Sequence, residues 1–265
     1  MLQGFGIGLR YKYLNDLLIN KDKIKWVELM ADYFLDEFNP MNKKIESLSS
    51  SYKFVLHSLN LSLASNSPLN NDYVLRLKSL VKQFKPLWVS DHLCFNIVGD
   101  KFLHDLLPFP FKKEILDIVC DKINIIRDII DCEFIIENIS SYLRFKDNDM
   151  SEAEFINEVV SRTNCGILLD VNNLFVTCTN HKESIKEYIN ILPMHKVKQI
   201  HMAGFTLKEN FLIDTHSRPV DENVLNIYTD LIKKNGYIPT CIEWDQELPN
   251  FDVILKEIDR LDAII

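Results

Sequence analysis

Histidine, aspartate and glutamate recur at the ends of short apolar segments in this chain of 265 residues. The segment KFVLH ends in His57, for example, and the segment GILLD ends in Asp170. Imidazole and carboxylate groups together suit zinc, iron or manganese, and clustered buried carboxylates need a cation to offset their charge. The pattern therefore predicts a metal site. Its candidate ligands are His57, His92, Glu137, Asp170, His201, Asp214, His216 and Glu243, and Asn173 could add a neutral oxygen.

The number of these ligands predicts more than one ion. A mononuclear catalytic site needs about three protein ligands, so the larger set points to two or three ions that share at least one carboxylate. Asp214 and His216 are two residues apart, which places both side chains on the same side of an extended segment. Glu28 also ends an apolar segment, and we expect it to pair with Arg10 near the rim rather than to bind metal.

Strand-like and helix-like patterns alternate along the whole chain. Strands are expected near residues 4–8, 25–29, 53–57, 86–90, 133–137, 166–170, 197–201 and 238–243. Helices are expected near residues 11–22, 39–49, 72–84, 112–130, 151–162, 182–192, 221–235 and 251–262. This alternation predicts the α/β class and a single (β/α)8 TIM barrel spanning residues 1–265 as one domain. The carboxyl ends of barrel strands meet at one face, so the candidate ligands would converge there.

Composition narrows the class of protein. A content of 47% hydrophobic and 26% charged residues can form a full core, which excludes a disordered chain. The formal net charge of −8 argues against a protein that holds nucleic acid through its overall field. No run reaches the roughly 18 apolar residues of a membrane span, and the N-terminal segment MLQGFGIGLR is not a signal peptide. We therefore expect a cytoplasmic protein that binds neither membrane nor nucleic acid.

The cysteines and the glycine-rich start carry little signal. The six cysteines lie far apart and form no C-x-x-C pair, so neither a disulfide framework nor a structural zinc ribbon is expected. The segment GFGIG lacks the third glycine of a dinucleotide-binding turn, and no strand precedes it. A dinucleotide-binding fold is therefore not expected.

Several segments of the sequence together resemble one known family. This family comprises the multinuclear non-heme iron-dependent oxidative enzymes, and it is also called domain-of-unknown-function family 692. Its members modify cysteine residues in ribosomally made peptides. The segments are GIGLR (6–10), WVEL (26–29), HSLNLSLAS (57–65), VSDHLC (89–94), LHDLLPFPF (103–111), IENISSYLRF (136–145), MSEAEFINEVVSRTNCGILLDVNN (150–173), IHMAGF (200–205), IDTHSRPV (213–220) and IEWD (242–245). They cover nearly the whole chain, and the family's TIM barrel agrees with the alternation described above.

The resemblance implies three ion positions that share ligands. The first ion would be held by His57, His92 and Glu137. The second would be held by Glu137, Asp170, His201 and Glu243, so that Glu137 bridges the two. The third would be held more weakly by Asn173, Asp214 and His216, because related zinc endonucleases have a histidine where Asn173 stands here.

Two more residues enter as catalytic candidates through the same resemblance. Asp245 matches a carboxylate of the family's active-site segment and is a candidate for proton transfer. His181 departs from the family's Asn-His-Gly pattern because Lys182 follows it, so we expect it to face the substrate or to support a ligand rather than to bind metal.

The implied reaction is a four-electron, O₂-dependent oxidation of a peptidyl cysteine. The cysteine would bind as thiolate to two or three iron ions in mixed Fe(II)/Fe(III) states, although zinc could fill the sites of a purified sample. The substrate would be a cysteine-containing precursor peptide. A separate partner protein would bind the leader segment of that precursor as an added strand, so a heterodimer is expected.

The ligand pattern also fits three other functions. A zinc-dependent phosphodiesterase or abasic-site endonuclease would use two ions to clamp the attacking and leaving oxygens, but the sequence has no stripe rich in lysine and arginine. A sugar isomerase commonly places a lysine near its metals, and no lysine stands at the predicted strand ends. A non-catalytic metal-binding protein would use the same ligands without turnover.

Overall fold

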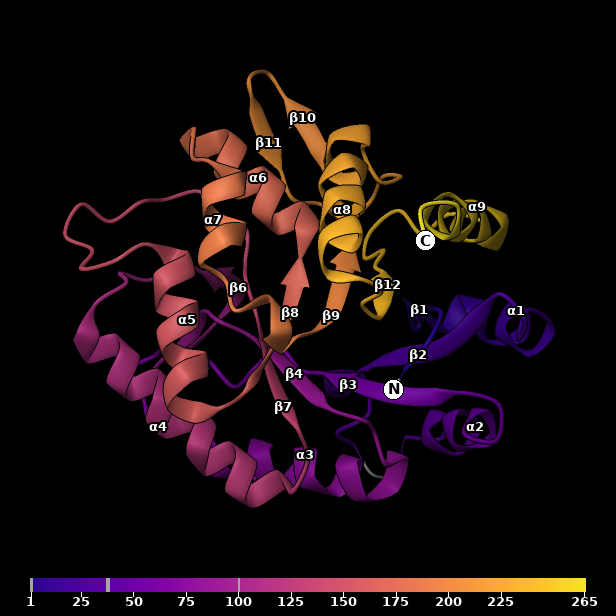
Figure 1. Ribbon diagram of the computed structural model, residues 1–265. Helices are drawn as coiled ribbons and strands as arrows, with labels where there is room; N and C mark the ends of the chain where they lie inside the picture. The colour runs from indigo at the N-terminus through magenta and orange to yellow at the C-terminus, as the bar shows by residue number, and fades with distance from the viewer. Residues whose placement is uncertain (1, 37–38, 100) are drawn as a thin grey trace.

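A closed barrel of parallel strands forms the centre of the computed structural model, which describes residues 2–36, 39–99 and 101–265 (Figure 1). Each strand pairs in parallel with its two neighbours, and β1 closes the ring by pairing with both β12 and β2. The (β/α)8 TIM barrel predicted from the sequence is confirmed. Its strands are β1 (Phe5–Gly8), β2 (Ile24–Met30), β3 (Lys53–His57), β4 (Val89–His92), β7 (Phe134–Glu137), β8 (Gly166–Asp170), β9 (Val197–Met202) and β12 (Thr240–Ile242).

Helices surround the barrel and bury their apolar faces against the outer side of the strands. They are α1 (Leu14–Ile19), α2 (Met41–Leu48), α3 (Asn71–Phe84), α4 (Lys113–Ile130), α5 (Glu152–Thr163), α6 (Val171–His181), α7 (Ile185–Ile191), α8 (Glu222–Asn235) and α9 (Phe251–Asp262). Ser151 begins α5 with a capping box, in which its hydroxyl accepts from the backbone N–H of Glu154. Among the described residues, no helix combines the length and apolar character that a membrane crossing requires.

The main differences from the predicted elements are helix α6, strand β4 and two hairpins. Helix α6 was not predicted, because no turn residue separates it from β8. Asp170 ends the strand, and its side chain caps the helix by accepting a hydrogen bond from the backbone N–H of Asn173 at 2.6 Å. Strand β4 begins and ends later than expected and therefore includes His92. Two antiparallel hairpins extend the loops after β4 and β9. They are formed by β5 (Phe95–Val98) with β6 (Lys101–Leu107), and by β10 (Thr206–Lys208) with β11 (Phe211–Ile213).

The barrel interior has an apolar floor below a polar layer. The floor is one buried cluster from several strands and the N-terminal segment: Leu2, Trp26, Val55, Trp88, Ile135, Leu168 and Cys241. Because side chains alternate between the two faces of a strand, the residue two positions further along points into the barrel one layer higher. In this way Val55 is followed by His57, and Ile135 by Glu137. The strands therefore deliver the polar ends to a common layer by their period of two alone.

Gly6 leaves room for the side chain of Trp26 in the apolar floor, and this close contact allows the packing to be tested. A Cβ at Gly6 would lie 2.4 Å from a ring carbon of the fully buried Trp26, whereas a Cβ at Gly8 would have no neighbour closer than 3.5 Å. We predict that Gly6→Ala lowers the free energy of unfolding by about 1–3 kcal/mol through overpacking. The matched control Gly8→Ala should unfold at nearly the wild-type urea concentration. Equal stabilities for the two variants in urea would contradict this packing.

Candidate metal centre

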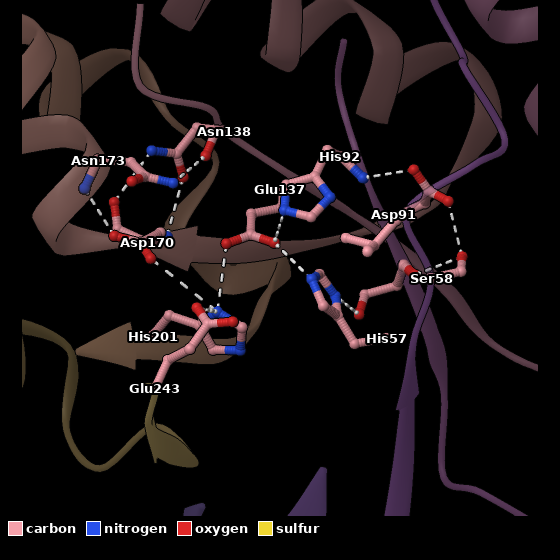
Figure 2. A network of polar contacts seen from close by, with 12 residues as sticks. His57, Ser58, Asp91, His92, Glu137, Asn138, Asp170, Asn173, His201 and Glu243 are labelled. Carbon is pink, nitrogen blue, oxygen red and sulfur yellow. Dashed lines mark hydrogen bonds and ion pairs between the residues drawn. The ribbon is translucent and has the colours of Figure 1, made fainter. Parts of the chain in front are cut away.

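The carboxylate of Glu137 lies at the middle of the polar layer, between two groups of metal-ligating side chains (Figure 2). Its Oε2 lies 3.4 Å from His57 Nε2 and 3.2 Å from His92 Nε2. Its Oε1 lies 3.2 Å from His201 Nδ1, on the opposite side. Glu137 is 1% exposed. The positions of its two oxygens are therefore compatible with the predicted role of Glu137 as a ligand shared by two ions.

On one side of Glu137, two imidazoles face the carboxylate with nitrogens that suit metal binding. The Ser90 hydroxyl donates to the backbone oxygen of Leu56 and thus accepts from His57 Nδ1, which lies 2.7 Å away. This leaves the lone pair of His57 on Nε2, toward Glu137. Burial and the neighbouring His92 lower the pKa of His57 well below its usual range, and burial lowers the pKa of His92 to about 4. Both rings are therefore neutral, as metal ligands must be.

On the other side, three carboxylates surround one imidazole. His201 Nδ1 lies 2.9 Å from Glu243 Oε2 and 4.0 Å from Asp170 Oδ2, in addition to its contact with Glu137. Burial raises the pKa of Glu137 to about 7 and that of Asp170 well above its usual range. Burial alone lowers the pKa of His201, but the nearby Glu28 and Glu243 outweigh it and raise that pKa well above normal. The site thus concentrates negative charge that a proton offsets in the absence of a metal.

A third group forms around His216, with a different membership from the predicted one. His216 Nε2 lies 2.8 Å from Asp214 Oδ1, and its Nδ1 lies 3.2 Å from Glu243 Oε2 and 3.4 Å from Asp245 Oδ2. His216, Glu243 and Asp245 offer ligand atoms close enough for one ion. Asn173 instead points its side chain at neighbouring loops, because its Oδ1 accepts from Ser140 Oγ and its Nδ2 donates to the Asn138 oxygen. Its role as a ligand stays a prediction.

The donor atoms of these groups fit metal ions. Within the described residues, Glu137 Oε2, Asp170 Oδ2 and His201 Nδ1 are buried and make no hydrogen bond, and the same holds for both ring nitrogens of His216. Buried polar atoms without hydrogen bonds are rare in proteins. The lone pairs of an imidazole nitrogen and a carboxylate oxygen that face each other at about 3 Å repel unless a proton or a metal ion lies between them. Imidazole and carboxylate donors suit iron, manganese or zinc. The residues therefore fit a multinuclear centre.

The loop that carries His216 is held in place by backbone contacts. The φ angle of His216 is 42°, in the left-handed region that few non-glycine residues adopt, and its backbone oxygen accepts from Asp245 N at 2.8 Å. Gly204 permits this arrangement, since a Cβ there would lie 2.2 Å from the Arg218 oxygen. Asp245 also forms an ion pair with Arg10 and is 40% exposed, so it stands at the mouth of the site.

Two other candidates lie away from the ions' expected positions. Glu28 does not pair with Arg10, and that prediction was wrong: its carboxylate lies 3.0 Å from His201 Nε2, inside the barrel, because residue 28 faces inward two positions after Trp26. His181 ends α6, and its Nε2 lies 2.8 Å from the backbone oxygen of Ser141. It joins none of the ligand groups among the described residues, and its catalytic role stays a prediction.

Sequence reasoning also missed residues that orient the ligands. Ser90 fixes the ring of His57, and Gln199 lies 2.6 Å from Glu28 through its Nε2. Asp91 faces away from the ions' expected positions and accepts from Ser58 Oγ and from the backbone of His92. The inward alternation along each strand was the available signal, since Ser90 and Gln199 each stand two residues before a histidine ligand.

Removal of the shared carboxylate tests the centre directly. We predict that Glu137→Gln weakens the binding of Co(II), used as a spectroscopic probe, at both positions that flank it, whereas a change to a single flanking ligand weakens one position. The metal-free variant should be at least as stable as wild type, because a buried charge among like charges has been removed. Metal titration and thermal unfolding measure the two effects. A variant that binds Co(II) as tightly as wild type at either position would contradict a shared ligand.

Solved structures of several enzymes share the barrel. The chain superimposes on the apo 3-keto-D-glucoside 4-epimerase YcjR from E. coli with a TM-score of 0.63 at 7% identity, over 99% of this chain and 98% of that one. Endonuclease IV from Thermus thermophilus gives a TM-score of 0.63 at 12% identity, over 98% of this chain and 97% of that one. At these identities the likeness is one of fold.

Relatives at higher identity and a family model identify the chain more closely. A UPF0276 protein from Acaryochloris marina (strain MBIC 11017) is 36% identical over 264 residues, which cover 100% of this chain and 95% of that protein. A UPF0276 protein from Anaeromyxobacter sp. (strain Fw109-5) is 36% identical over 98% of this chain and 92% of its own length. The model of the RiPP precursor modification enzymes MbnB/TglH/ChrH matches residues 4–265. The chain belongs to this family.

Proposed function

We propose that this protein oxidises cysteine residues of a ribosomally synthesised precursor peptide, with iron in the metal centre and O₂ as the electron acceptor. The observation that carries the proposal is the position of Glu137, whose two oxygens face two separate groups of ligands within 3.4 Å. A carboxylate placed between two ligand groups could serve both, and a pair of ions held there would supply the multi-electron chemistry that the oxidation needs. Membership in a family of precursor-modifying enzymes supports a peptide substrate.

The chain's own residues would bind the ions inside the barrel and keep water away from them. Iron, when bound, supplies one-electron chemistry and the positive charge that keeps a cysteine ligand as its thiolate. His57 and His92 would hold one ion with Glu137, while Asp170, His201 and Glu243 would hold the second with it. His216, with Asp214 or Asp245, would hold a third.

Proton transfer is assigned to the mouth of the site. Asp245 is the exposed carboxylate there, and its two oxygens contact Arg10 and His216. Arg10 holds the carboxylate beside the centre, where it can accept the proton of an incoming thiol. His181 is assigned to substrate contact, because its bond to the Ser141 oxygen places it beside the loop that follows β7.

Apolar side chains around the same face fit a peptide. The loops after β4, β7 and β9 leave the carboxyl ends of the strands, on the side that carries the metal centre. Large exposed apolar residues on these loops are Val98, Phe102, Leu103, Tyr142, Leu143, Phe145, Leu207 and Phe211. Tyr142 and Phe211 come from different loops, and their rings lie 5.6 Å apart. Exposed apolar surface of this kind commonly binds other chains, and we assign it to the precursor and to a partner that holds the leader.

Mass spectrometry tests the proposed reaction. The protein is co-expressed in air with a cysteine-containing candidate precursor and a candidate leader-binding partner chosen from the neighbouring genes, and the peptide mass is measured. We predict a mass change confined to fragments that contain cysteine, and none when Glu137→Ala replaces the wild type or when cysteine is replaced by serine. An unchanged mass with an iron-loaded enzyme would contradict the proposal, and so would cleavage of abasic-site DNA by the zinc-loaded protein.

The role of Asp245 gives a separate prediction. We expect Asp245→Asn to lower the rate of single turnover by roughly 10²-fold or more, because a positioned proton acceptor contributes at least that much. The ions flanking Glu137 should stay bound, since their ligands come from the barrel strands. Iron quantitation together with rapid-quench kinetics separates the two effects. Loss of an ion from the His216 group in this variant would show a ligand role instead.

A further inference from the structure

A buried chain of hydrogen bonds runs from the apolar floor to the metal centre. Trp88 Nε1 donates to Gln199 Oε1 at 2.7 Å, and Gln199 Nε2 donates to Glu28 Oε2 at 2.6 Å. Glu28 Oε1 lies 3.0 Å from His201 Nε2. Glu28 is 3% exposed, and Gln199 and His201 are fully buried. The four residues come from β2, the segment that enters β4, and β9, so the chain crosses the barrel interior.

The donors of this hydrogen-bond network favour one direction, although Gln199 Nε2 also lies 2.9 Å from His201 Nε2. Both oxygens of Glu28 lie within 3.1 Å of His201 Nε2, and a carboxylate can only accept, so that nitrogen carries a proton. The indole N–H of Trp88 can only donate, so it fixes the amide of Gln199 with its oxygen toward Trp88 and its NH₂ toward Glu28. The carboxylate of Glu28 then accepts from Gln199 and from the Nε2–H of His201. When a metal ion replaces the proton on Nδ1, His201 would keep its other proton on Nε2 and offer the lone pair of Nδ1 to the ion. That nitrogen is the one that faces Glu137 and Glu243.

We propose that Glu28 is a positioning residue, which holds His201 with Nδ1 toward the ion shared with Glu137, Asp170 and Glu243. The pair of Trp88 and Gln199 in turn holds Glu28. A carboxylate behind a histidine ligand fixes the orientation of the ring and makes it a stronger donor to the metal. The inference rests on the metal centre of the proposed function and is independent of the reaction that this centre performs.

The surroundings of Glu28 favour this role over one in packing. Its side chain lies next to the apolar floor, where a carboxylate costs stability and a hydrophobic residue would fill the space. Cys241 Sγ is 4.0 Å from Glu28 Oε1, so the thiol offsets little of that cost. If Glu28 positions His201, replacing it should raise the stability of the metal-free protein and weaken metal binding. A packing residue should affect stability first.

Replacement of Glu28 by glutamine tests the inference. The NH₂ group of the new side chain can donate to His201 Nε2, which moves the ring proton to Nδ1 and blocks the ion. We expect Glu28→Gln to weaken Co(II) binding at the second position by about 10- to 100-fold and to change its visible absorption, with the His57 and His92 position unchanged. The metal-free variant should be as stable as wild type or more so.

Two further variants make the result decisive. Glu152→Gln replaces a buried carboxylate on α5 that belongs to none of the ligand groups, and it should bind Co(II) as wild type does. Trp88→Phe keeps an aromatic ring in the floor but removes the donor to Gln199, so it should weaken the same position to a lesser degree. If Glu28→Gln does not fold, the Co(II) affinity of Trp88→Phe tests whether Glu28 positions His201.

Two results would overturn the inference. The first is a Glu28→Gln variant whose Co(II) affinity and absorption match those of wild type. If Glu28→Gln does not fold, the same result in Trp88→Phe would overturn the inference. The other is a fall in metal-free stability together with equal weakening at both positions, which would show a packing role. The titration uses no peptide and no O₂, so a failure of the proposed reaction would leave this result intact.

Discussion

Repulsion among buried carboxylates, and its relief by cations, is the constraint on which this structure depends. Glu137, Asp170 and Glu243 meet inside the barrel, and among the described residues their ion pairs are all with histidines. Two of the four histidines are held neutral, so three ionised carboxylates would exceed the positive charge that the other two histidines can supply. Burial accordingly raises the pKa of Glu137 to about 7 and that of Asp170 well above its usual range. A packed barrel offers no solvent to screen this charge. The fold is thus built around positions that only positive ions can complete.

The sequence predicted the barrel and its main ligands because both follow from short-range patterns. A period of two within each strand and an ionisable residue at its end were enough to place His57, Glu137 and Asp170 at one face. Helix α6 was missed because Asp170 serves as strand end, helix cap and candidate ligand at once, and no turn residue marks the boundary. A local pattern cannot show that one residue has three roles.

The rest depends on contacts between distant segments, which no local pattern encodes. Glu28 and Gln199 meet across the barrel from strands that are not neighbours, and their contact is set by the stagger of the whole sheet. The orientation of Asn173 and the neighbours of His216 are set by loops, whose course depends on close backbone contacts such as the one at Gly204. Residue types indicated metal binding in both cases, but only the three-dimensional arrangement determines which atoms face one another.

The position of Glu137 between the two ligand groups has a consequence for the stability of the protein in a cell. Its strand, β7, lies between β4 and β8, and the ligands on its two sides come from opposite parts of the closed ring. An ion held on each side would tie the two halves of the ring together and would shift the folding equilibrium by mass action. During metal starvation the same carboxylates would push the halves apart, and the chain would open more often to proteases. Abundance of the protein would then follow the metal supply before any change in its synthesis.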